Sequence, residues 1–407
     1  MKHYQDTDTG QVYAFEDEVD PFALALTNRN IPKTLSENVI PKPSEAHVWF
    51  NGGWIKNSDA PKNYEQPTSS IPTYNPAWVV FLQPYTAVLV TPRDKLEVTL
   101  EQINSNSYDN DKLSKVVMSL PLSETGLQAF VTYDGAVSIP RNDQFPTNEL
   151  AITGFNRILC AILLGGMHVE VVSPSELYSG TLLNGTDIFL HNPTIQGNLR
   201  HKLTPITDRM LPLMHPRIIS AQDLINAHRH GVSVMNCIKN FSPHFLLHGY
   251  TSMIKQNRSD ALGSLWIVVE QLTWAIWESK FIQSPQFHPA CEMKSRKDSL
   301  KSDNRTWPIS VKHELLWQTK LLSDQCYEAL SVARKLRNDL VHRGDAPDFI
   351  AISNLWKNLS EMFETASGIN LDGMRRLLPL GSPSLGLPHK GNFDEWKKLE
   401  GKVFKGA

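Results

Sequence analysis

The sequence has 407 residues, 41% of them hydrophobic and 20% charged, and its formal net charge at pH 7 is −2. This composition is typical of a globular protein with room for two or three domains. The richest apolar run, residues 265–277, is shorter than the roughly 20 residues of a membrane span, and the polar residues 1–10 do not resemble a secretory signal. The four cysteines lie far apart and form no C-x-x-C pair, which indicates reduced thiols. We therefore expect a cytoplasmic protein without a membrane segment.

The charge is distributed unevenly along the chain. Residues 1–20 carry six acidic side chains and one lysine, whereas residues 292–343 carry eleven Lys and Arg against seven Asp and Glu. The near-neutral total argues against tight, non-specific binding to duplex nucleic acid, which needs many phosphate contacts. An anionic partner is expected in the carboxy-terminal half; the alternative is that the local excess of positive charge is only a solvated face.

The sequence predicts an α+β multidomain fold. Residues 1–75 are a small β-rich amino-terminal module and linker, with a tight hairpin at Asn51-Gly52 and a proline-rich linker at 61–76. Residues 76–215 are a mixed α+β domain, which we assign to sensing or regulation. Its predicted elements are strands at 78–82, 87–90, 129–133 and 168–172, and a helix at 149–164 that ends at Gly165-Gly166.

Residues 216–370 are predicted to be an all-helical bundle. Ser220 can cap a helix that begins at Ala221, and Asp260 lies in the first turn of an aromatic-rich helix. Residues 294–305 are polar and basic and predict a loop, whereas apolar residues at steps of three and four predict one long helix over 310–343 that ends at Gly344. Further helices are expected at 245–256 and 348–365, and residues 371–407 are predicted to be an irregular basic tail.

An Arg-x(4)-His motif closes the predicted long helix. Arg337, Asn338 and His342 occur there, followed two residues later by the helix-ending Gly344. A second pair with similar spacing, Arg209 and His215, lacks a helical pattern. Along an ideal helix a five-residue step turns 500°, so Arg337 and His342 point about 140° apart. They converge only if the helix unwinds near Gly344 or if a second protomer supplies half of the site.

The blocks 259–277 and 333–345 resemble HEPN domains of bacterial anti-phage and toxin proteins. The resemblance implies a homodimer whose motif helices pair across a two-fold axis, and metal-independent cleavage of single-stranded RNA. The ribose 2′-hydroxyl would attack the adjacent phosphate, with His342 as general acid or base and Arg337 on the phosphate. Asn338 would orient the imidazole or the phosphate. The products would be a 2′,3′-cyclic phosphate and a 5′-hydroxyl, and the resemblance implies no cofactor.

Glu270 is a supporting candidate because a carboxylate on an aromatic helix face needs a cationic partner or water. Trp266 and Trp274 lie one turn on either side of it. We expect Arg337 or Arg334 as the partner; the alternative is that this edge of the helix reaches water. Asp339, inside the motif, completes the set of supporting residues.

The sequence contains no pattern typical of a metal site or a nucleotide-binding loop. His228, His230, Cys237, His244 and His248 form the densest group of possible metal ligands, but their spacing does not match a structural zinc site. We therefore expect no bound metal. The sequence contains neither a phosphate-binding P-loop nor a dinucleotide fingerprint.

Residues 4–15 resemble the amino-terminus of phage tail-fibre assembly proteins, which implies a prophage setting or a docking module for a phage structural protein. Two hypotheses remain. The first is an endoribonuclease that arrests growth during phage infection and is restrained or triggered by residues 1–215. The second is a phage- or prophage-derived protein whose helical domain only dimerises or binds RNA or a nucleotide.

Overall fold

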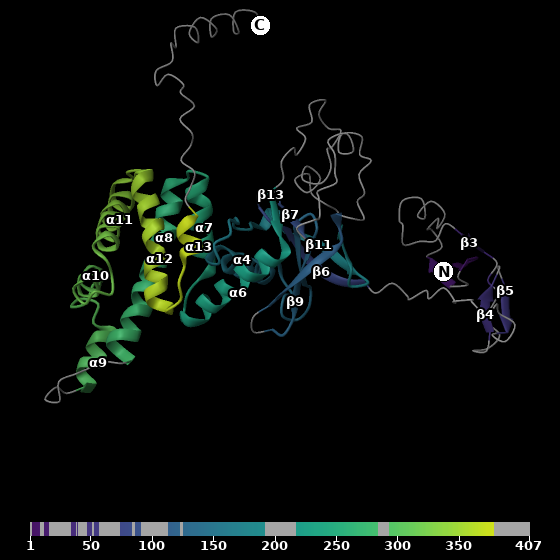
Figure 1. Ribbon diagram of the computed structural model, residues 1–407, viewed down its shortest axis with the longest axis horizontal. Helices are drawn as coiled ribbons and strands as arrows, with labels where there is room; N and C mark the ends of the chain where they lie inside the picture. Colours follow the sequence, from purple (N-terminus) through teal and green to yellow (C-terminus); the bar gives the residue numbers. More distant parts are fainter. Residues whose placement is uncertain are drawn as a thin grey trace, which may run out of the picture. The chain divides into compact units, whose positions relative to one another are not determined.

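The protein combines helices and β-sheets, as the sequence predicts (Figure 1). The computed structural model describes residues 2–8, 12–15, 34–37, 39, 47–50, 53–56, 74–83, 86–90, 113–122, 125–191, 217–283 and 293–377. The chain divides into two compact units, residues 1–75 with 181–189 and residues 76–180 with 190–407. Within the described ranges, every helix is too short or too polar to cross a membrane.

The amino-terminal unit consists of short antiparallel strands. Strand β1 (Lys2–Asp6) lies between β2 (Val12–Phe15) and β3 (Leu35–Ser36). Strands β4 (His47–Phe50) and β5 (Gly53–Lys56) form the predicted hairpin. Their register pairs Phe50 with Gly53, which leaves a two-residue connection at Asn51-Gly52. The hairpin prediction is therefore confirmed, whereas most of the predicted linker lies outside the described residues.

The second unit begins with an antiparallel sheet in which β6, β10, β9 and β8 are successive neighbours. The strands predicted at 78–82, 87–90 and 129–133 are all present. Strand β7 pairs in parallel with β13, directly before the first bundle helix. The strand bounds are β6 Tyr74–Phe81, β7 Thr86–Leu89, β8 Val116–Pro121, β9 Gln128–Thr132, β10 Ala136–Pro140, β11 Tyr178–Leu183, β12 Asp187–His191 and β13 Arg217–Ser220.

The predicted strand at 168–172 is wrong, because this segment is not paired in a ladder. Its backbone bonds to side chains of two helices, α4 (Asn148–Leu164) and α7 (Pro243–Ile254). The amide of Asn156 both accepts from the Val172 N–H at 3.0 Å and donates to its carbonyl at 3.3 Å, and Thr251 Oγ1 accepts from the Val171 N–H at 2.9 Å. The segment is extended, as its alternating pattern indicated. Its backbone groups at Val171 and Val172 bond to side chains and not to a neighbouring strand.

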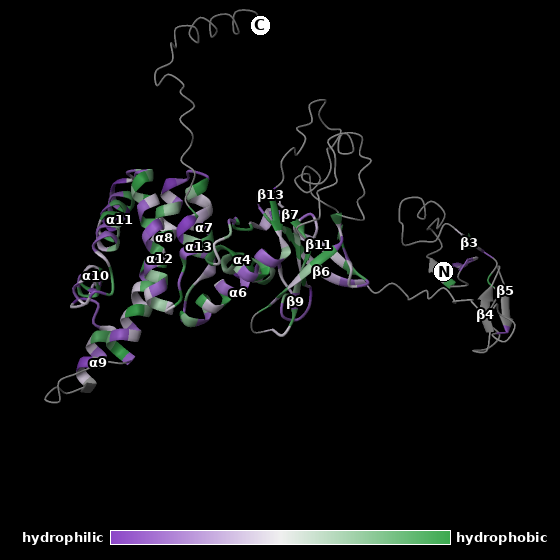
Figure 2. Cartoon of the chain, viewed as in Figure 1, coloured by the Kyte–Doolittle hydropathy of each residue, from purple (hydrophilic) through white to green (hydrophobic). Residues whose placement is uncertain are grey.

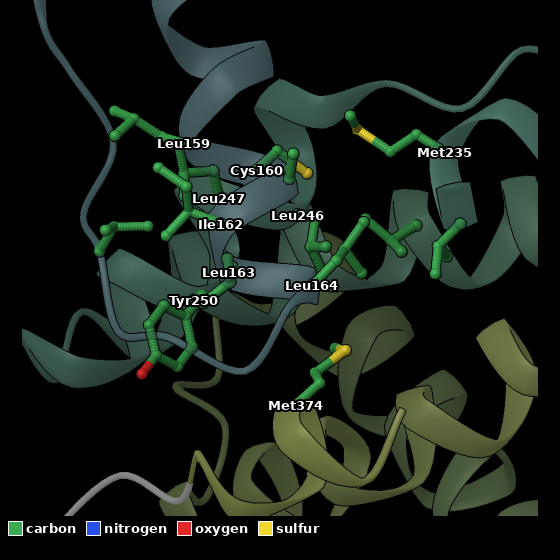
Figure 3. Packing of buried hydrophobic residues seen from close by; sticks show 14 of the residues in the cluster. Leu159, Cys160, Ile162, Leu163, Leu164, Met235, Leu246, Leu247, Tyr250 and Met374 are labelled. Carbon is green, nitrogen blue, oxygen red and sulfur yellow. The ribbon is translucent and has the colours of Figure 1, made fainter. Parts of the chain in front are cut away.

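Helices α4, α6 (Ala221–Cys237), α7 and α8 (Arg258–Trp277) pack into one hydrophobic core that also contains sheet residues. Figure 2 shows mixed hydrophilic and hydrophobic residues along the bundle helices. In Figure 3, side chains of α4, α6, α7 and the short α13 (Asp372–Arg376) meet in this core. The core therefore joins residues on both sides of the boundary expected near 215.

The predicted loop at 294–305 is largely a helix, α9 (Met293–Ser302). It follows a π-helical turn at Glu278–Gln283 that continues α8. Two tryptophans hold α9: Trp277 Nε1 donates to the Leu300 carbonyl at 3.0 Å, and Trp307 Nε1 donates to Ser299 Oγ at 3.4 Å. The polar, basic composition indicated a loop, but these contacts from outside the segment stabilise the helix.

The predicted helix over 310–343 is two helices, α10 (Ile309–Gln318) and α11 (Asp324–Arg343). Lys320 takes the left-handed conformation with φ of 61°, and Leu322 is buried. Ser323 then begins α11, because its Oγ accepts from the Cys326 N–H at 3.1 Å. Glu361 of α12 (Phe349–Ser367) accepts from both the N–H and the hydroxyl of Ser323 at 2.6 Å.

Replacing Ser323 with alanine is expected to lower the free energy of unfolding by about 1–2 kcal/mol, because the change removes a helix cap. Urea denaturation followed by circular dichroism measures this effect. The matched control is Ser331→Ala in the interior of α11, where alanine is a better helix former than serine. Equal stability of the two variants would contradict the capping role.

Helix α12 confirms the helix predicted at 348–365. Asp348 caps it by accepting from the Ala351 N–H at 3.3 Å. The expected irregular tail begins with the helix α13, whose Met374 is fully buried in the core. Residues 378–407, the rest of that predicted tail, lie outside the described residues.

Candidate functional site

Arg337 extends the buried face of α11 beyond the core. Seven residues turn about 700°, so Arg337 lies about 20° from Leu330, which is fully buried. Its partly buried side chain lines a groove of about 340 Å³ between α11, α8 and α7. The groove is also lined by Asp260, Gly263 and Glu270 of α8 and by His248 of α7. The structure therefore brings Arg337 and Glu270, both predicted site residues, to the same groove.

His342 does not share this groove. Helix α11 remains regular through Arg343 and ends at Gly344, which has a left-handed φ of 75° and donates its N–H to the Leu340 carbonyl at 3.0 Å. His342 is exposed to solvent. Because the helix does not unwind before Gly344, Arg337 and His342 of one chain diverge by about 140°. Arg337 and His342 can therefore meet only if one of them comes from a second protomer.

Glu270 has a different partner from the one predicted. Its Oε1 accepts the indole N–H of Trp266 at 2.7 Å, and the residue is exposed. Within residues 217–283 and 293–377, no guanidinium lies within ion-pair distance of this carboxylate. The Glu270 carboxylate therefore accepts from an indole of its own helix and otherwise faces water. This is the alternative that the sequence left open.

The other motif residues lie at the solvent side of the helix end. Asn338 is exposed, and Asp339 pairs with Arg343 one turn later. Arg334 lies near His313 of α10 and helps to lower the pKa of that histidine. None of these three side chains lines the groove that contains Arg337. The second spacing match, Arg209 to His215, lies outside the described residues.

The sequence reasoning missed His248 as a residue of the groove that Arg337 lines. Its Nδ1 lies 2.9 Å from the Ser264 hydroxyl, and both residues line the groove. Its ring also stacks on His244, with centroids 5.6 Å apart. The signal was present in the sequence as a histidine-rich segment, but only the packing of α7 against α8 places His248 at the groove that Arg337 lines. The groove therefore contains an imidazole from the same chain.

Two histidines are buried in neutral form near the bundle core. Burial lowers the pKa of His313 to about 4, with a further contribution from Arg334, and its Nε2 lies 2.8 Å from the Thr273 hydroxyl. Burial also lowers the pKa of His228 to about 4. Next to His313, Lys312 lies over the Trp274 ring, 4.5 Å from its centroid, and burial lowers its pKa.

Stability is expected to fall as the pH decreases from about 6.5 to about 4. Unfolded histidine binds a proton near pH 6.5, whereas the folded His313 and His228 do so only near pH 4. Between these values the unfolded state binds more protons, so each group contributes a slope of up to about 1.4 kcal/mol per pH unit. Urea denaturation at several pH values measures the slope. An unchanged slope in both His313→Gln and His228→Gln would contradict the prediction.

The structure gives the histidines that were considered for metal binding different surroundings. His228 is buried, and His230 Nε2 lies 2.9 Å from the Asn370 carbonyl oxygen. In the part of the chain that the structure describes, no group of three or more His, Cys, Asp or Glu is arranged to hold a metal ion.

The groove offers a guanidinium, an imidazole, two serine hydroxyls and two carboxylates. A guanidinium binds phosphate oxygens in a fixed fork, and an imidazole transfers protons near neutral pH. The carboxylates of Asp260 and Glu270 oppose an anion, so a phosphate would have to bind directly to Arg337. Comparison of the chain with protein-family models, with curated proteins and with solved structures found no match.

Proposed function

We propose that the protein is a metal-independent endoribonuclease of the HEPN type that cleaves single-stranded RNA. One observation carries the proposal: Arg337 lies partly buried in a groove, and its guanidinium forms no ion pair with a described carboxylate. A guanidinium in this situation is suited to a phosphodiester.

In this proposal the substrate supplies its own nucleophile. The ribose 2′-hydroxyl attacks the adjacent phosphorus, the bond to the 5′-oxygen of the next nucleotide breaks, and Arg337 stabilises the charge that develops on the phosphate oxygens. An imidazole accepts the proton of the 2′-hydroxyl, and an imidazolium donates one to the leaving oxygen. We assign this proton transfer to His342 of a second protomer, because the regular helix directs His342 away from Arg337 of its own chain.

The test is incubation of the purified full chain with single-stranded RNA in EDTA, followed by analysis of the product ends. We expect 2′,3′-cyclic phosphate and 5′-hydroxyl ends. Arg337→Ala and His342→Ala are each expected to slow cleavage by at least about a hundredfold. The matched control is Arg343→Ala, which removes a cation from the same helix end but not from the groove. Cleavage that requires a divalent cation, or that survives both substitutions, would refute the mechanism.

A second function is favoured by the divergence of Arg337 and His342 and by the two carboxylates in the groove. In this alternative the helical domain dimerises, or binds RNA or a nucleotide, without cleaving it. Expression in bacteria separates the two functions. A nuclease poisons the cell as the wild type but not as His342→Ala or Arg337→Ala, whereas a binding module is tolerated equally in all three forms.

The biological role that we attach to the nuclease is growth arrest in the cytoplasm during phage infection. Such an activity must be restrained in healthy cells. Residues 1–215 are the proposed place of that restraint, with a phage structural protein as one trigger. Residues 4–15, which resemble tail-fibre assembly proteins, support this partner. Co-expression of wild type with such a phage protein would then change its toxicity.

A further inference from the structure

A pocket of about 440 Å³ lies where the end of α8 meets α9 and α10. Helix α9 lies at one end of the helical bundle (Figure 1). This aromatic pocket is lined by the rings of Trp277, Phe281 and Trp307 and by Arg296; two leucines and two serines complete it. It shares no residue with the groove that Arg337 lines. A pocket of this size with mostly apolar walls and a few polar groups is typical of a ligand site.

The aromatic rings are held in fixed positions. Trp277 is fully buried, and the other two rings pack against it. The Phe281 ring stacks on it with centroids 4.5 Å apart, and the Trp307 centroid lies 5.7 Å away with an interplanar angle of 45°. Both indole N–H groups are already bonded to α9. Phe281 and Trp307 are only partly buried, so the accessible ring surface is suited to stacking and not to hydrogen bonding.

Phe281 belongs to the π-helical turn Glu278–Gln283 that continues α8. Such turns are rare and occur frequently at functional sites. In this turn the Phe281 ring lies against Trp277 and lines the pocket. The irregular end of α8 therefore contributes a ring to the aromatic pocket.

The helix beside these rings is basic. Helix α9 contains four Lys and Arg and one Asp. In the part of the chain that the structure describes, Arg296 and Lys301 of this helix are exposed and form no ion pair. Arg296 lines the aromatic pocket. The sequence predicted an anionic partner for this basic region, and a guanidinium beside stacking rings is the combination that binds a base together with its phosphate.

The aromatic pocket and the groove that Arg337 lines are neighbours along α8. Glu270 lines the groove and Trp277 lines the pocket. Seven residues turn about 700°, so these two positions lie about 20° apart around α8 and about 10 Å apart along it. About three nucleotides, at about 3.4 Å each in a stacked strand, span this distance. One single strand can therefore contact both places.

We propose that a base of single-stranded RNA stacks on Phe281 and Trp307 in the aromatic pocket, with a phosphate of the strand at Arg296. The choice of RNA as the ligand rests on the proposed function, but the site requires binding alone and no cleavage. Every base has a face that can stack, so the pocket holds the strand without reading its sequence. A free nucleotide carries the same base and phosphate, and the experiment distinguishes the two sources.

The test measures binding of a fluorescein-labelled RNA strand to the full chain by fluorescence anisotropy in EDTA. Methylation of its 2′-hydroxyls removes the nucleophile, so the strand is not cut. We expect Phe281→Leu, which keeps an apolar side chain but removes the ring, to weaken binding about tenfold. Arg296→Ala should also weaken binding, and should reduce the slope of log Kd against log salt concentration by about 1.

Each variant has a matched control outside the pocket. Phe349→Leu changes a partly buried phenylalanine of α12, and Arg229→Ala removes an exposed cation of α6. Both should bind the strand as the wild type does. Arg296 is exposed, so its replacement should preserve folding, which circular dichroism checks for all four variants.

Two further ligands identify what the pocket binds. An abasic strand of the same length should bind the wild type only as well as the complete strand binds Phe281→Leu. AMP that binds the wild type more tightly than the strand would make a free nucleotide the ligand and overturn the proposal. So would equal affinity of the wild type for the abasic and complete strands, unchanged binding in both pocket variants, or no binding by the wild type.

This site and the proposed ribonuclease fail separately. A strand that binds as expected, together with unmethylated RNA that the wild type leaves intact, would refute cleavage but not the site. Unmethylated RNA at a concentration below its Kd, cleaved by Phe281→Leu and Arg296→Ala as fast as by the wild type, would refute the site but not cleavage.

Discussion

Gly231→Ala is expected to lower the free energy of unfolding by about 3 kcal/mol or more, because it forces two packed helices apart. A Cβ atom at Gly231 of α6 would lie 1.9 Å from the carbonyl oxygen of Ala161 in α4. The same two helices approach closely at a second point, where a Cβ at Gly165 would lie 2.1 Å from the Ala227 carbonyl oxygen. Both obstacles are backbone atoms, which cannot rotate away.

The cost extends beyond one contact because α4 and α6 lie in the common core. Separating them exposes apolar side chains of the core, which also contains sheet residues; Figure 3 shows the α4 and α6 part of it. Urea denaturation followed by circular dichroism measures the change. The control is Gly263→Ala in α8, where a Cβ would meet no atom within 4 Å. That variant is expected to gain up to about 1 kcal/mol from helix propensity. Similar stability of both variants would show that α4 and α6 are not in close contact.

Mixing two inactive variants is expected to restore RNA cleavage if the site is shared between protomers. Arg337→Ala and His342→Ala are each inactive as homodimers in the proposed mechanism. In a mixed dimer, the intact Arg337 of one chain faces the intact His342 of the other. After exchange of subunits, about half of the dimers are mixed and one of two Arg–His pairs in each is intact, so about a quarter of the wild-type rate should return.

The control for this complementation is a mixture of Arg337→Ala with the double variant Arg337→Ala/His342→Ala. No chain in this mixture has Arg337, so it should remain inactive. Subunit exchange is verified by native mass spectrometry of the mixture. Failure of verified mixed dimers to cleave RNA, while the wild type cleaves it, would assign the imidazole to the same chain. His248, which shares the groove with Arg337, would then be the residue to replace.

The chain's local patterns predicted most helices of the second unit. Helix α4 has the predicted continuous apolar stretch and the predicted end at Gly165, and α6 begins at the predicted Ser220 cap. Such signals act within about one helical turn, and therefore they can be read from neighbouring residues. The Asn51-Gly52 hairpin was predictable for the same reason.

Contacts between distant residues decided what these patterns could not. The break between α10 and α11 depends on the burial of Leu322 and on Glu361, which lies 38 residues beyond Ser323. The spacing of apolar residues continued across the break between α10 and α11, because Leu322 and Cys326 are both buried in the same core. Residues 168–172 alternate like a strand, but only the placement of Asn156 and Thr251 decided that side chains satisfy their backbone.

In the candidate site, too, local sequence determined some features and packing determined others. The sequence by itself determined the helix end, its Arg337–His342 spacing and the angle of about 140° between the two side chains, because helix geometry follows from the backbone alone. Only the tertiary structure decided which of the two faces a groove. The packing of α11 against α8 turns Arg337 toward the groove that His248 also lines and leaves His342 in solvent, since burial of Leu330 and Ala333 sets the rotation of the whole helix.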